Sequence, residues 1–282
     1  TISFGLPNVP AWRSYQYFLV IRLKFKMKKV FRAIIVCLMS LAIGAITSLF
    51  VFDSITRSYE VPEAIELGSM DNVNPRLPIS QKRALKKSRE SAVRILSLDP
   101  TTSAFSSASG TYLTVFGRYF VLTVRHGITG PCVYTKIMMD DTLRNCKAFI
   151  ELNATVDYAL IEVDELPTKT PVKISTDVPH GRQWARQLAV LNKVFYTGFP
   201  NSIGPLTVDG TIMAYSTQDF IYLHSYAWAG SSGSGVFSTD GKLLGYVLAL
   251  DVGQTEYGMN VLEDVVLVVP VFKVNGMSIK EQ

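Results

Sequence analysis

The chain has 282 residues, of which 48% are hydrophobic, and a formal net charge of +5. Residues 1–90 hold 14 Lys and Arg against 6 Asp and Glu, whereas residues 91–282 hold 14 against 17. The positive charge therefore belongs to the N-terminal third. This distribution argues against a basic nucleic-acid-binding face on the rest of the chain and is typical of a segment beside a membrane.

Residues 1–32 combine aromatic side chains with cations, six of which lie between Arg22 and Arg32. Such a mixture suits the headgroup region of a bilayer. Residues 33–52 follow without a single charged side chain. As a helix they would measure about 30 Å, the thickness of a bilayer core. We therefore predict a transmembrane helix over 33–52; a buried helix and a signal-peptide core are the alternatives.

The cations before this segment outnumber those just after it, where Asp53, Glu60, Glu63 and Glu66 lie. The positive-inside rule predicts a single-pass membrane protein whose later residues lie outside the cytoplasm, although further spans in a longer product could override it. The small residues Ser40, Gly44 and Ser48 form a stripe through which the helix could make a homo-oligomer.

Residues 53–90 carry several prolines and a basic run over 81–90, and little apolar periodicity. We interpret them as a linker or stalk, with the basic run as a solvated face. The sequence begins at Thr1 rather than Met, so we expect it to be part of a longer product.

From residue 91 to residue 282 short β-rich runs alternate with Gly, Pro, Asn and Asp turns. Twelve strands are expected, at 92–96, 111–116, 119–123, 134–138, 148–152, 159–163, 188–195, 207–214, 220–225, 235–238, 243–250 and 265–271. The pattern predicts one all-β domain built as a barrel or sandwich, or as two small barrels.

Three cysteines are present, and no Cys/His cluster suggests a metal. Cys37 lies in the apolar run. Cys132 and Cys146 could form a disulfide in an oxidising compartment or remain free thiols, and their spacing does not decide between the two. We expect neither a metal nor a cofactor.

Three polar residues in this domain suggest nucleophilic catalysis. His126 ends an apolar run and can exchange a proton near neutral pH. Asp157 precedes another apolar run, and Ser232 lies in the glycine- and serine-rich stretch 229–236. To act as a nucleophile, a serine needs a base within hydrogen-bond reach, and the base needs an acid that fixes its tautomer. Considered singly, His126 could be a surface histidine, Asp157 a turn former and Ser232 part of a linker. Considered together, in this order along the chain, they predict a catalytic triad.

The motifs around these residues resemble those of the trypsin/chymotrypsin-type (PA clan) serine proteases. Residues 123–126 are similar to the family's Thr-x-x-His, 157–161 to its Asp-x-Ala-Leu-[Leu/Ile], and 230–234 to its Gly-[Asp/Asn]-Ser-Gly-[Gly/Ser]. Supporting similarities occur at 108–111, 198–200 and 245–247. Departures are Ser231 before the serine, Gly235 in place of Pro, and Gly127 after the histidine.

The resemblance implies two antiparallel six-stranded barrels with a cleft between them. It assigns His126 as general base, Asp157 as its orienting acid and Ser232 as nucleophile, with the Gly230 and Ser232 N–H groups as oxyanion hole. It places the substrate side chain before the cut near Tyr226 and near Leu248, Ala249 and Leu250. Because Tyr226 carries no negative charge, we expect an apolar or small residue there. His224 could help to read that residue or could be a strand histidine without a role.

The sequence thus predicts a membrane-tethered serine endopeptidase whose partner is a polypeptide substrate. We predict that it processes the polyprotein of an RNA virus, because the sequence does not begin with Met and no peptide-binding module follows the β-domain. The alternative setting is a bacterial cell-envelope quality-control protease, which the positive-inside orientation favours. The alternative class is a catalytically inactive, peptide-binding member of the fold.

Overall fold

The computed structural model describes residues 32, 34–47, 73–139, 142–255 and 258–275. The chain divides into two units, residues 1–61 and 62–282. In the first unit residues 34–47 are helical and every one of them is exposed. Among the described residues no helix has both the length and the apolar character needed to cross a bilayer. Residues 33 and 48–52 of the predicted span, most of the segment 1–32 and residues 53–72 of the predicted linker lie outside the described residues.

The second unit begins with helix α3 (Ile79–Ser91). Its buried residues Ala84, Ser88 and Ser91 recur at helical spacing and form one face. The Ser88 hydroxyl lies 2.8 Å from Thr197 Oγ1, and Arg89 donates to Thr207 Oγ1 at 2.8 Å. The basic run interpreted as part of a solvated stalk is therefore partly buried on the β-domain, because its small residues face the strands while Arg83 and Lys86 stay exposed.

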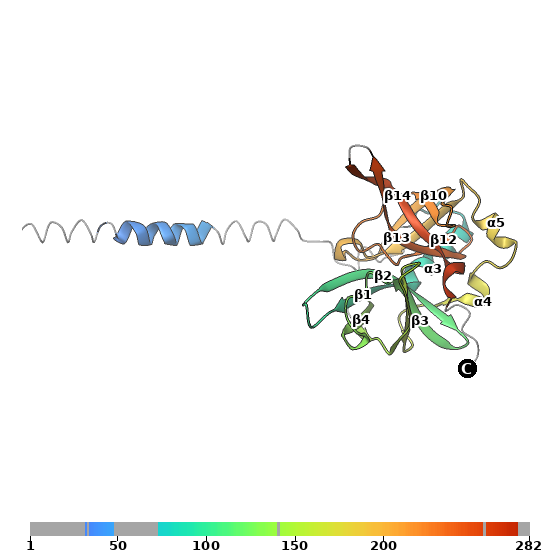
Figure 1. Ribbon diagram of the computed structural model, residues 1–282, viewed down its shortest axis with the longest axis horizontal. Coiled ribbons are helices and arrows are strands. Elements are labelled where there is room, and N and C mark those ends of the chain that lie inside the picture. The colour runs from blue at the N-terminus through green and yellow to red at the C-terminus, as the bar shows by residue number, and fades with distance from the viewer. Residues whose placement is uncertain (1–31, 33, 48–72, 140–141, 256–257, 276–282) are drawn as a thin grey trace, which may run out of the picture. The chain divides into compact units, whose positions relative to one another are not determined.

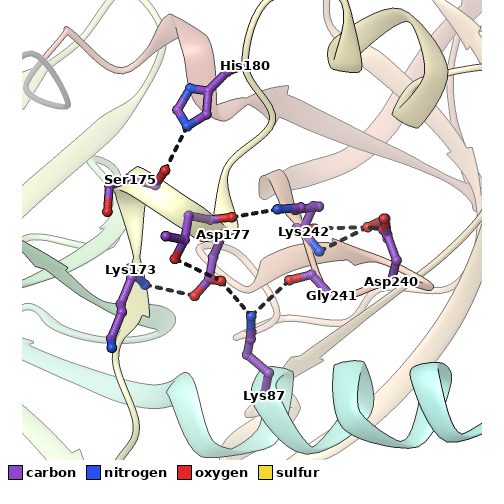
Figure 2. Close-up of polar contacts among 10 residues, drawn as sticks. Lys87, Lys173, Ser175, Asp177, His180, Asp240, Gly241 and Lys242 are labelled. Carbon is purple, nitrogen blue, oxygen red and sulfur yellow. Dashed lines mark hydrogen bonds and ion pairs between the residues drawn. The ribbon is translucent and has the colours of Figure 1, made fainter.

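Lys87 ties α3 to two distant segments, as Figure 2 shows. Its Nζ lies 2.8 Å from Asp177 Oδ1 and donates to the Gly241 carbonyl at 3.3 Å. Asp177 ends the short helix α4 (Ile174–Asp177), which belongs to the connection between the two halves of the domain, and Gly241 lies in a turn of the second half. The helix thus links both halves.

The first half is an eight-stranded sheet in the order β5-β4-β1-β2-β3-β7-β6, with β8 beside β2. Its strands are β1 (Ala92–Leu98), β2 (Phe105–Val115), β3 (Arg118–Val124), β4 (Thr135–Met139), β5 (Thr142–Asn145), β6 (Ala148–Asn153), β7 (Tyr158–Val163) and β8 (Val172–Lys173). The 3-10 helix η1 (Cys132–Tyr134) precedes β4, and a disulfide joins Cys132 to Cys146 just after β5.

The second half is a closed six-stranded barrel in the order β10-β11-β14-β13-β12-β9. Its strands are β9 (Lys193–Gly198), β10 (Leu206–Tyr215), β11 (Ile221–His224), β12 (Gly235–Ser238), β13 (Leu243–Thr255) and β14 (Gly258–Pro270). Helix α5 (Gln183–Gln187) precedes β9, the 3-10 helix η2 (Pro200–Ser202) follows it, and η3 (Val271–Lys273) follows β14. In Figure 1 the green strands of the first half lie below the orange and red strands of the second.

The chymotrypsin-like β-fold is confirmed, and the six-stranded barrel is confirmed for the second half. For the first half the prediction of six strands is wrong, because the short strands β5 and β8 add to the sheet. One apolar cluster fills each half, around Ile161 and around Ile212. A third cluster joins them and contains Leu122 from β3 and Tyr246 from β13. This shared core packs the two halves together beneath the candidate site.

Candidate active site

His126 and Asp157 are neighbours because their strands pair. In the antiparallel ladder of β3 and β7, Val124 lies opposite Tyr158, so the residues just beyond these positions meet. The Arg125 N–H donates to the Asp157 carbonyl at 3.1 Å. The Asp157 side chain accepts from the His126 N–H at 2.8 Å through Oδ1, and its Oδ2 lies 2.5 Å from His126 Nδ1. One carboxylate thus holds both the backbone and the ring of the histidine.

Asp157 adopts a left-handed backbone, with φ of +54°. Few residues other than glycine take this conformation, and aspartate is among those that tolerate it best. The preceding turn is closed by Asn153 Oδ1, which accepts from the N–H groups of Thr155 at 2.9 Å and Val156 at 3.1 Å. The conformation of the acid is therefore set by the turn before it.

Tyr246 supports this turn from the second barrel. The ring is fully buried, and its hydroxyl donates to the Val156 carbonyl at 2.6 Å. Burial raises the pKa of Tyr246, and the negative charge of Asp157 raises it further. The phenol therefore stays protonated and keeps its role as donor, which couples β13 to the loop that carries Asp157.

Ser232 lies in a turn with two left-handed glycines, Gly230 at φ +95° and Gly233 at φ +90°. Within this turn the Ser231 N–H donates to the Trp228 carbonyl and the Gly233 N–H to the Val247 carbonyl, both at 2.8 Å. Among the described residues the N–H groups of Gly230 and Ser232 have no acceptor. These two are the donors expected for an oxyanion hole, and the turn leaves them free for a ligand.

Ser109, on β2, holds the backbone on both sides of the Ser232 N–H. Its N–H donates to the Ser232 carbonyl at 2.9 Å, and its hydroxyl donates to the Gly230 carbonyl at 2.7 Å. The same hydroxyl accepts from the Phe199 N–H at 2.8 Å. Ser109 is fully buried, so a residue of the first sheet fixes a loop of the second barrel.

Gly233 lets this loop approach the first sheet. A Cβ at Gly233 would lie 2.0 Å from the Ser109 carbonyl oxygen and 2.5 Å from Thr123 Oγ1. Thr123 lies on β3, three residues before His126, so the residue after Ser232 packs on the strand that leads to the histidine. Ser232 is half buried there, and within the described part of the chain its hydroxyl makes no hydrogen bond, including none to His126.

Ser234, the other serine of this loop, is fully buried, and its hydroxyl donates to the Ser231 carbonyl at 2.6 Å. A hydroxyl that is enclosed and already bonded in this way cannot reach a substrate carbonyl. The structure therefore leaves Ser232 as the only accessible side-chain hydroxyl between Gly230 and Gly235, all of which are described residues.

The predicted substrate-binding residues lie on β11, in the segment that follows it, and on β13. Tyr226 and His224 are exposed, and His224 Nε2 lies 3.7 Å from Asp264 Oδ2. Leu248 is partly buried against the shared core. Ala249 and Leu250 lie on β13, but their side chains are outside the described residues.

Ser109 and Tyr246 were missed as site residues. The similarity at 108–111 drew attention to the segment of Ser109 without giving it a role, and nothing in the sequence around Tyr246 links it to Asp157. The remaining histidine, His180, has its Nε2 3.0 Å from the Ser175 carbonyl, close to α4 (Figure 2). No group of three or more His, Cys, Asp or Glu side chains suited to a metal occurs among the described residues.

Comparison with known proteins supports the fold. Residues 108–245 match the family described as the trypsin-like peptidase domain. The fold is similar to the crystal structure of the Rv3671c protease from M. tuberculosis in its active form, with 18% sequence identity, a TM-score of 0.54, and coverage of 70% of this chain and 83% of that chain.

It is also similar to the serine endoprotease from Yersinia pestis, with 19% identity and a TM-score of 0.53 over 70% of this chain and 64% of that chain. This chain thus spans less than two thirds of the Yersinia protein. At such identities the likeness establishes the fold. A search of curated protein sequences finds no match.

Proposed function

We propose that this protein is a serine endopeptidase that works through His126, Asp157 and Ser232. The observation that carries the proposal is the Asp157 carboxylate bound to both the N–H and the ring of His126, beside a turn that carries Ser232 and two free N–H groups. An inactive binding protein has no need of this arrangement, because a peptide can be held without a base oriented by an acid.

The proposed reaction follows from these positions. With Asp157 on Nδ1, the Nε2 of His126 is the free basic nitrogen and takes the Ser232 proton as Oγ bonds to the substrate carbonyl carbon. The carbonyl oxygen gains negative charge and accepts from the N–H groups of Gly230 and Ser232, each of which is worth about 3 kcal/mol in such sites. His126 then gives the proton to the leaving amine as the C–N bond breaks. Water attacks the acyl-enzyme while the same ring takes its proton, and the ring returns that proton to Ser232 Oγ as the ester bond breaks and the acid leaves.

The proposed setting is a membrane. The eight large apolar side chains of the helix at 34–47 are between 42% and 71% exposed, and water alone does not stabilise so much apolar surface on all sides. We retain the transmembrane helix over 33–52 and the topology in which the β-domain lies outside the cytoplasm. The stripe through Ser40 and Gly44 remains the proposed contact of a homo-oligomer.

The Cys132–Cys146 disulfide supports that topology, because disulfides persist in oxidising compartments such as the bacterial periplasm. Of the two settings that the sequence predicts, it favours the bacterial cell-envelope protease. Processing of a viral polyprotein is the second candidate, to which the disulfide lends no support.

Labelling with a fluorophosphonate tests the proposal, because the probe reacts with an activated serine. Wild type should be labelled, and Ser232→Ala should not. His126→Ala and Asp157→Asn should each slow the reaction by about three to six orders of magnitude. Ser238→Ala, which removes another buried serine hydroxyl, should be labelled normally. An unlabelled wild type, or a labelled Ser232→Ala, would refute catalysis by Ser232.

A further inference from the structure

One end of the second barrel carries a cluster of exposed, large apolar side chains, named here the apolar patch. Its members are Val190, Leu191, Met213, Tyr215 and Phe272. Three of them line one hollow of about 350 Å³ together with Trp184 and Leu188. The Leu191 N–H donates to the Ile212 carbonyl at 2.8 Å, which places Leu191 beside Met213 on β10. We infer that the apolar patch docks on a phospholipid bilayer that carries anionic headgroups.

The fold holds the most exposed member of the patch outwards. Leu191 is 76% exposed and has a left-handed backbone, with φ of +72°, which a leucine rarely adopts. The turn around it is fixed, because Asn192 Nδ2 donates to the Arg186 carbonyl at 2.8 Å and to the Gln187 carbonyl at 2.9 Å. Backbone strain of this kind is concentrated at functional positions. An ordered turn that presents a leucine to the surroundings is suited to insertion into an apolar phase.

The composition of the patch is typical of a membrane–water interface. Trp184 contacts Phe272 edge to face, with ring centroids 5.0 Å apart, and Tyr215 lines the same hollow. Trp and Tyr are enriched where the headgroups meet the acyl chains, because their rings are apolar and their N–H or O–H groups are polar. Leucine and phenylalanine side chains beside them supply the surface that enters the bilayer.

Positive charge surrounds the patch, although the β-domain as a whole is acidic. The patch and its surroundings belong to three segments, residues 182–193, 213–220 and 271–273. These segments hold four cations and one acid, whereas residues 91–282 hold 14 cations and 17 acids. The one acid, Asp219, lies 3.7 Å from Lys273. Arg182 and Arg186 are four residues apart, on one side of α5, and both are exposed. Cations placed in this way are attracted to an anionic lipid surface.

A bilayer fits this charge better than a second copy of the chain does. In a two-fold dimer the same surface meets itself, so the two arginines of one copy would face those of the other. The patch also lies away from the nucleophile loop. It adjoins Lys193, and β9 runs from Lys193 over about 17 Å to Gly198, next to the Phe199 N–H that donates to Ser109.

The inference rests on the proposed membrane setting and not on catalysis, and one experiment separates the two. The full chain is placed in vesicles of phosphatidylcholine and phosphatidylglycerol whose acyl chains carry a nitroxide, which quenches a fluorophore near the bilayer. Cys37 is the free cysteine, so a fluorophore on the natural chain reports whether the helix at 34–47 enters the membrane. In a Cys37→Ser background, Ala189→Cys carries the fluorophore beside the patch and Phe116→Cys carries it in the turn before β3. We expect quenching at 37 and 189, and severalfold less at 116.

Leu191→Asn removes the most exposed side chain of the patch and supplies a residue that tolerates a left-handed backbone. It should lower the ratio of docked to undocked domains, measured by quenching at 189, by about ten- to a hundredfold, as the loss of one buried leucine does. Phe116→Asn is the matched control, because Phe116 is 72% exposed and also left-handed, with φ of +49°. It should leave the ratio as in wild type.

The contribution of charge is tested by Arg182→Gln combined with Arg186→Gln. Loss of two cations near an anionic surface should lower the ratio by about thirtyfold, and vesicles of phosphatidylcholine alone should lower it for wild type as well. Both arginines are exposed, so this variant keeps the test valid if Leu191→Asn does not fold.

Absence of quenching at 37 would refute the membrane setting, and the inference with it. Quenching at 37 with no more at 189 than at 116 would overturn the inference alone, as would quenching at 189 that both the leucine and the arginine variants leave unchanged. Energy transfer between fluorophores at 189 on neighbouring copies, without quenching by the lipid there, would assign the patch to a second copy and would also overturn the inference.

Discussion

Ser109→Ala tests whether a residue of the first sheet positions the nucleophile loop. The substitution removes one oxygen atom that makes two buried hydrogen bonds, to the Gly230 carbonyl at 2.7 Å and from the Phe199 N–H at 2.8 Å. Each group left without a partner costs about 1 to 3 kcal/mol when it is buried. We therefore expect the free energy of unfolding to fall by about 2 to 6 kcal/mol, measured by urea denaturation.

Catalysis should suffer beyond this loss of stability. Without the bond to Ser109 the Gly230 carbonyl is free to turn, which changes the backbone at the residue whose N–H is an expected oxyanion donor. A misplaced donor forfeits part of the hundredfold or greater effect that such a donor has. We expect the rate of fluorophosphonate labelling to fall by about ten- to a hundredfold at a temperature at which the variant is folded.

Ser238→Ala is the control for stability alone. Ser238 is also buried, and its hydroxyl bonds to Asp240 and accepts from the Lys242 N–H at 3.0 Å, at the far end of β12 from the nucleophile. It should lose stability and keep the labelling rate. If Ser109→Ala is labelled as fast as Ser238→Ala, the reasoning about Ser109 is refuted.

Two further predictions concern residues outside the triad. Tyr246→Phe deletes the hydroxyl that donates to the Val156 carbonyl at 2.6 Å, and it should lower kcat of peptide hydrolysis several-fold with little change in KM, because the turn before Asp157 loses its support. The control is Tyr112→Phe, which deletes another buried hydroxyl, one that accepts from the Leu166 N–H at 3.0 Å, and should lower stability without this effect on kcat. Equal kcat values for the two variants would contradict the role of Tyr246. Reduction of the Cys132–Cys146 disulfide, whose cysteines are 14 residues apart, should lower the free energy of unfolding by about 3 kcal/mol and Tm by about 6 to 12 °C in calorimetry; an unchanged Tm after confirmed reduction would show that the disulfide does not stabilise this fold.

Much of the β-domain could be predicted from sequence because its strands carry local signals. Short β-rich runs separated by turn residues predicted most of the strands that the structure has. The short strands β5 and β8 were missed, because four and two residues are too few to show a period. The strand expected over 188–195 starts later in the structure, because β9 begins only at Lys193. Helix α5 ends just before Leu188, and the turn between α5 and β9 takes up the first residues of the expected strand.

Helix α3 shows a different limit. Its sequence is dominated by cations, which predicts a solvated face, yet Ala84 and Ser88 are buried. Burial at these positions depends on a surface supplied by β9, β12 and β2, which no local pattern in residues 79–91 could reveal.

The order and spacing of His126, Asp157 and Ser232 and the glycines of the nucleophile loop were readable in the sequence, because each depends on the few residues beside it. What the tertiary structure alone decided is how these pieces are held: Ser109 of β2 bonds to the loop of Ser232, and Tyr246 of β13 bonds to the loop of Asp157. Ser109 is 121 residues from Gly230 and Tyr246 is 90 residues from Val156. Such bonds depend on how the first sheet and the second barrel pack together, and the packing is a property of their shared core rather than of any one segment of the chain.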